Sequence, residues 1–76
     1  MVPIDPLLSS TVRFAISAGP LTSARVRQCQ VEATRQGVSM LNICTEAELL
    51  HLQLIRRAMG EDITWEAAVA VIEAGA

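Results

Sequence analysis

The side chains that most often carry out chemistry are few in this sequence. One histidine, His51, and two cysteines, Cys29 and Cys44, are accompanied by no tyrosine. Together with Glu48 they offer the donor types of a metal site, but none shows a paired-ligand spacing such as C-x-x-C or H-x-x-x-H. We therefore predict no metal and no other cofactor. We interpret His51 as a neutral histidine, hydrogen-bonded where helices pack.

The paired carboxylates, Glu46 with Glu48 and Glu61 with Asp62, fall where helices are expected to begin. Negative charge is favourable at a helix N-terminus, so capping explains both pairs without catalysis. No nucleophile and general base stand out as a pair, and the glycines mark helix ends rather than a phosphate-binding loop. The sequence thus predicts a protein that is not an enzyme and has no small-molecule substrate.

Charge is distributed unevenly along the chain. Residues 1–38 carry four arginines and two acidic residues, which gives a net charge of +2. Residues 39–76 carry two arginines and six acidic residues, a net charge of −4. The acidic second half repels phosphate, while the basic first half tolerates it.

Capping residues and glycines divide the chain into helical segments. Asp5 and Pro6 are typical of a helix start, and the segment that they open ends at residues 19–20. A second helix is expected from residue 22 or 23 to residue 36, with Gly37 as its stop signal. Residues 45–48 form a capping box for a third helix that runs to residue 58 or 59, and Thr64 caps a fourth helix over residues 65–74.

Two stretches allow more than one structure. Residues 11–17 alternate apolar and other side chains, which is the periodicity of a strand, although we favour a helix. Residues 38–43 are either an extended connector or a helical lead-in capped by Ser39. The sequence as a whole predicts one all-α domain over residues 1–76, built as a small bundle or array of three to four short helices.

The third and fourth helices carry more apolar surface than a small fold can cover. With residues placed about 100° apart, apolar side chains occupy half or more of the third helix. On the fourth helix only Glu66 and Glu73 interrupt the apolar surface. Exposed apolar patches mark interaction sites, and arginines add charge and orientation to them. The predicted partner-binding residues are Leu49, Leu52, Trp65, Val69, Val71 and Ile72, with Arg25 and Arg27.

An alternative function rests on the basic first half. Residues 15–27 resemble a helix-turn-helix, in which Arg25, Arg27 and Gln28 would contact bases or phosphates in the major groove. With a strand at residues 12–16, the order of elements instead resembles ribbon-helix-helix repressors. Residues 52–72 resemble the final helices of MerR-type regulators. These resemblances imply a dimeric DNA-binding transcriptional regulator.

The small size of the chain favours self-association or a protein partner. A domain of this length buries only about 60% of its unfolded surface, so its core alone is marginal. With neither a secretory signal nor a membrane-spanning stretch, we expect a cytoplasmic location and reduced thiols. The favoured function is a non-enzymatic regulator of bacterial, phage or mobile-element origin. It would act as an inhibitor, adaptor or small chaperone that occupies a partner's surface, as a homodimer or in a hetero-complex.

Overall fold

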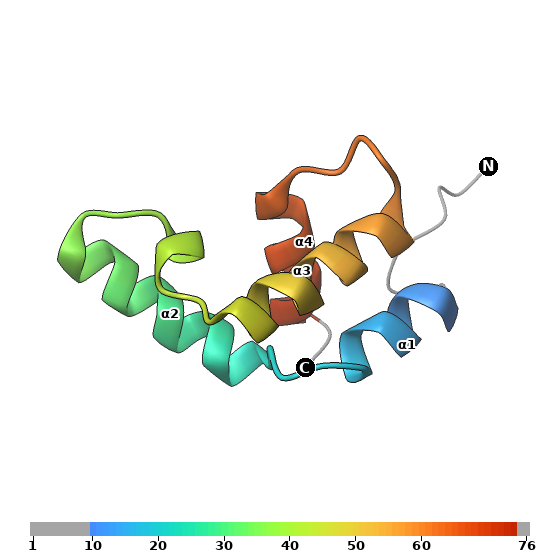
Figure 1. Cartoon of the computed structure of the whole chain (residues 1–76), viewed down its shortest axis with the longest axis horizontal. Coiled ribbons are helices and arrows are strands. Elements are labelled where there is room, and N and C mark those ends of the chain that lie inside the picture. Colours follow the sequence, from blue (N-terminus) through green and yellow to red (C-terminus); the bar gives the residue numbers. More distant parts are fainter. Residues whose placement is uncertain (1–9, 75–76) are drawn as a thin grey trace.

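All regular secondary structure in the described part of the chain is helical. The computed structural model describes residues 10–74, so the predicted helix start at Asp5 and Pro6 lies outside the described residues. Four α-helices and one 3-10 turn follow one another (Figure 1). They are α1 (Ser10–Ser17), α2 (Ser23–Gln36), η2 (Met40–Asn42), α3 (Glu46–Met59) and α4 (Trp65–Ala74). The prediction of a small all-α array is confirmed.

Capping side chains and a glycine mark where these helices begin and end. The Thr22 hydroxyl accepts a hydrogen bond from the Arg25 amide at the start of α2, and Gly37 ends that helix with φ 69°. Thr45 and Glu48 form the predicted capping box of α3. Ser39 caps the short turn η2, so the segment before α3 is a helical lead-in rather than an extended connector.

Residues 11–17 form helix α1, and the alternative of a strand there is not realised. The buried side chains of this segment are Val12 and Ala15, which lie three residues apart as on one face of a helix. Phe14 is 73% exposed, although the alternating pattern places it on the same face as Val12. The apparent alternation therefore arose because one large apolar residue faces outward.

Helix α3 lies centrally and packs against both α1 and α4. Helix α4 also packs against α2, and α2 extends away from α3 (Figure 1). One cluster of buried apolar side chains draws on every helix and on the connector before α2. Its members are Ala15, Leu21, Val26, Leu52, Ile55, Ala68 and Ile72.

His51 connects α3 to the segment that joins α1 and α2. Its Nδ1 accepts a hydrogen bond from the Leu21 amide at 3.0 Å, and its Nε2 lies 2.8 Å from the carbonyl oxygen of Ala15. A carbonyl only accepts, so Nε2 carries the hydrogen and the ring is neutral. This confirms the interpretation of His51 as a neutral, hydrogen-bonded histidine between helices.

The ring of His51 also explains the glycine at residue 19. A Cβ atom added at Gly19 would overlap the imidazole, so the chain passes the ring too closely for any side chain. We expect Gly19→Ala to lower the free energy of unfolding by about 1–3 kcal/mol, the usual cost of overpacking. Chemical denaturation monitored by circular dichroism measures this loss. Ala18→Ser, at an exposed neighbouring position, should change stability by less than about 0.5 kcal/mol.

A double variant identifies the ring as the cause. In a His51→Ala background the further cost of Gly19→Ala should largely vanish, because contacting residues are not additive. An undiminished cost in that background would show that the constraint on Gly19 lies elsewhere.

Candidate functional site

Arg25 and Glu48 form an ion pair between the first turns of α2 and α3. Arg25 Nε donates to Glu48 Oε2 at 2.6 Å, and Arg25 Nη2 donates to Oε1 at 3.2 Å. The Glu48 side chain is 6% exposed and that of Arg25 is 32% exposed. The backbone amide of Thr45 also donates to Glu48 Oε1, at 2.8 Å. One carboxylate thus caps its own helix and binds the neighbouring one.

The pair shifts the titration of both groups toward their charged forms. The hydrogen-bonded Arg25 guanidinium lowers the pKa of Glu48, and burial opposes this only in part. The same contact raises the pKa of Arg25. Both residues are therefore charged at neutral pH, and the buried carboxylate is compensated.

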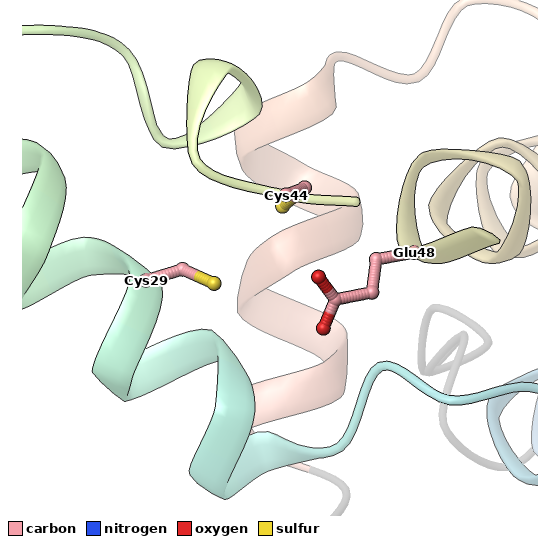
Figure 2. A group of neighbouring side chains, drawn as sticks. All are labelled: Cys29, Cys44 and Glu48. Atoms are coloured by element: carbon pink, nitrogen blue, oxygen red, sulfur yellow. The ribbon is translucent and has the colours of Figure 1, made fainter. Parts of the chain in front are cut away.

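Two cysteines lie beside this ion pair. Cys29 comes one helical turn after Arg25 on α2 and is fully buried, and Cys44 immediately precedes the capping residue of α3. The two sulfur atoms and a carboxylate oxygen of Glu48 all lie within 4.8 Å of one another. Figure 2 shows the three side chains converging from α2, from the loop before α3 and from α3 itself.

Both cysteines are free thiols. Burial, and next the adjacent Cys29, raise the pKa of Cys44 to about 11. The Cys44 side chain is therefore a protonated thiol at neutral pH and a weak nucleophile.

The sequence analysis named four residues with metal-donor atoms but no paired spacing. Three of them, Cys29, Cys44 and Glu48, lie together in this cluster. The fourth, His51, takes no part, because both of its ring nitrogens are bound to backbone groups. Spacing rules did not find the cluster because its members come from three separate segments. The only available signal was the position of Cys44 and Glu48 on either side of the capping residue Thr45.

The predicted partner-binding residues of α3 and α4 are only partly accessible. Leu52 and Ile72 lie in the core and are at most 1% exposed, so neither reaches a partner in this structure. Leu49 and Val71 are half-buried. Trp65 and Val69 are half-buried as well and line a groove with residues of α2 and of the segment around η2. The guanidinium of Arg56 lies over the Trp65 ring at 4.8 Å.

The accessible apolar surface of α3 lies on its outer side. Leu50 is 61% exposed and Leu54 is 46% exposed, and the two lie one turn apart. With Ala47 and Arg57, which are also exposed, they follow a three, four, three spacing along one face. We call these four residues the α3 outer face. Periodicity placed Leu50 and Leu54 on an apolar arc but did not indicate which side of that arc the rest of the chain covers.

The predicted DNA-binding residues of α2 have different environments. Arg25 is held by Glu48, and its Nη1 also donates to Gln28 Oε1 at 3.3 Å. Arg27 and Gln28 are exposed. Helices α1 and α2 make few contacts with each other, unlike the packed pair of a helix-turn-helix.

Comparisons of the chain with protein-family profiles, with curated proteins and with solved structures find no match. The site is therefore assigned from its own geometry. Among residues 10–74, no helix combines the length and the apolar character that a membrane crossing requires.

The ion pair leads to a prediction about stability. Arg25→Met should lower the free energy of unfolding at pH 7, because it leaves the Glu48 carboxylate without its cation. Denaturant titrations of the wild type, of Arg25→Met, of Glu48→Gln and of the double variant together give the coupling free energy between the two residues. Arg35→Met is the matched control, since its pair with Glu32 is exposed and its loss should cost less than about 0.5 kcal/mol.

Acid should remove the stability that the ion pair of Arg25 and Glu48 contributes. Because the pKa of Glu48 is lowered in the folded state, the pair stabilises the fold above the ordinary carboxyl value of 4.5. That stabilisation is lost as pH falls below 4.5 and through the folded-state pKa. The difference between wild type and Arg25→Met should therefore shrink in acid. A difference that stays constant from pH 7 into acid would contradict this assignment.

Proposed function

We propose that this chain is a small non-enzymatic regulatory protein of the cytoplasm that acts by protein–protein binding, with a second copy of itself as the partner of α3. The observation that carries the proposal is the exposure of Leu50 and Leu54 on the α3 outer face. Two large apolar side chains one turn apart give a helix the short apolar ridge that helix-to-helix docking uses. We therefore place the contact surface on the outer side of α3, and not on the inner residues of α3 and α4 that the sequence predicted.

The environment of the reactive side chains also supports a binding role. His51 uses both ring nitrogens in hydrogen bonds to backbone, so it has no free nitrogen for proton transfer. Glu48 is ionised and bound by Arg25. The Cys44 thiol, with a pKa near 11, is protonated at neutral pH. None of these three groups therefore offers a free general base or a thiolate nucleophile at neutral pH.

We assign a second copy of the chain as the occupant of the α3 outer face. Glu46 lies at one end of the face and Arg57 at the other, and both are exposed. When two such helices pair antiparallel, Leu50 of one copy lies opposite Leu54 of the other, and the acidic end meets the basic end. The face is complementary to itself, as a two-fold interface requires. Parallel pairing would place like charges together.

Substitutions on the outer face test the proposal. Wild type should sediment near twice its monomer mass of 8.2 kDa at chain concentrations of about 100 µM and dissociate on dilution. Leu50→Glu combined with Leu54→Glu should sediment as a monomer, because the ridge then carries like charges across the two-fold axis. Circular dichroism should remain that of the wild type, since both side chains lie outside the core.

The matched control is Val31→Glu, which makes the same kind of change at a 63% exposed position on α2. It should leave the association unchanged. A wild type that remains monomeric at the highest concentration would refute self-association through this face.

DNA binding remains the alternative function, and one observation favours it. Arg27 and Gln28 are exposed in the first two turns of α2, where a recognition helix presents its base contacts. The helical structure of residues 11–17 removes the ribbon-helix-helix version, which needs a strand there. Arg25, held by Glu48, has less freedom to bind phosphate than the resemblance implied.

An electrophoretic mobility-shift assay at low salt separates the two functions. We expect no retardation of duplex DNA, because the net charge of −2 opposes binding and Arg25 is already paired with Glu48. Retardation that weakens steeply with salt and is lost in Arg27→Ala, but kept in Arg35→Ala, would establish the DNA-binding alternative instead.

A further inference from the structure

The junction of α2 and α3 has the composition of a metal-binding site. It contains two thiols and one carboxylate, and their donor atoms lie within 4.8 Å of one another. In a tetrahedral zinc site with bonds of about 2.3 Å, neighbouring sulfur atoms are about 3.8 Å apart. A closure of about 1 Å at most would bring these three donors to that spacing. Cys44 lies in the loop between η2 and α3, outside any helix.

Glu48 retains capacity for one more contact. A carboxylate has roughly four lone-pair directions, and Arg25 and the Thr45 amide occupy three of them. Metal-bound carboxylates are commonly held by just such outer hydrogen bonds, which fix the orientation of the ligand. Arg25 would therefore position Glu48 rather than displace a metal ion.

The charges of such a site balance. Two thiolates and one carboxylate carry three negative charges, which a divalent ion and the Arg25 guanidinium neutralise together. We propose that Cys29, Cys44 and Glu48 bind a divalent, thiolate-preferring metal ion, zinc by the chemistry of its ligands. Each thiol releases its proton to solvent as the ion binds. The half-buried position of Cys44 leaves the fourth coordination site to water or to a donor outside the chain.

The metal site and the proposed dimer contact lie on different sides of α3. Glu48 lies on the inner side of α3, and Leu50 and Leu54 lie on its outer side. Bound metal would connect α2, the loop before α3 and α3 itself, and α2 and α3 share few other contacts. A chain this small gains most from such a connection, because its core alone is marginal.

Titration of the reduced, full-length protein with Co²⁺ tests the proposal. Tetrahedral thiolate coordination should give the near-ultraviolet charge-transfer band of a cobalt–thiolate bond, with one ion bound per chain. Zn²⁺ should displace the Co²⁺. At about a hundredfold excess over its Kd, Zn²⁺ should also raise the Tm by about 10–20 °C.

The variants assign the ligands. Cys44→Ala and Cys29→Ala should each abolish the charge-transfer band, and Glu48→Gln should weaken Co²⁺ binding by tenfold or more. Glu61→Gln is the matched control at an exposed acidic position and should bind as the wild type does. Circular dichroism of the metal-free Cys44→Ala variant checks that the loss of binding is not a loss of fold.

Two results would overturn the proposal. One is a reduced wild type that shows no charge-transfer band and no change in Tm with Zn²⁺. The other is metal binding that persists in both cysteine variants, which would place the ion elsewhere. Conversion of the pair to a disulfide by peroxide, without metal binding by the reduced protein, would identify a redox pair instead.

Discussion

The arrangement of the helices depends on the buried carboxylate of Glu48. This carboxylate, in the first turn of α3, caps that helix and accepts two hydrogen bonds from Arg25 on α2. It also lies beside two thiols. Helices α2 and α3 share few other contacts, so this junction is the main direct link between them, although α2 also packs against α4 and η2 (Figure 1). A buried charge is costly unless it is compensated, and the compensation here comes from another helix. The contact between α2 and α3 therefore depends on electrostatics as well as on apolar packing.

His51 performs the corresponding task for α1. Its two ring nitrogens bind the last turn of α1 and the segment before α2, and Gly19 leaves room for the ring. Glu48 and His51 lie three residues apart on the same side of α3. One face of α3 thus carries two polar side chains. Glu48 binds α2, and His51 binds the end of α1 and the segment that follows it. Such directional contacts fix the position of a small array whose apolar core is too limited to do so alone.

The sequence predicted those features that depend on neighbouring residues. The capping box of Thr45 and Glu48, the start of α2 at residue 23 and the Gly37 stop are local, and each was found where expected. Residues 11–17 were ambiguous because Phe14 faces outward, which only tertiary packing decides. The cluster of Cys29, Cys44 and Glu48 joins three segments, so no spacing rule could find it. Likewise, the periodicity of α3 showed an excess of apolar surface without indicating which side its own chain would cover.

The two sides of α3 are linked through the order of its first turns. The inner side holds the ion pair and the thiols, and the outer side begins only one or two residues away with Ala47 and Leu50. A first turn that frays would release Glu48 from Arg25 and would also displace Leu50, because a helix cannot lose one face and keep the other. Whatever stabilises the junction therefore favours the outer face as well. By linkage, occupation of the outer face must in turn favour the ordered junction.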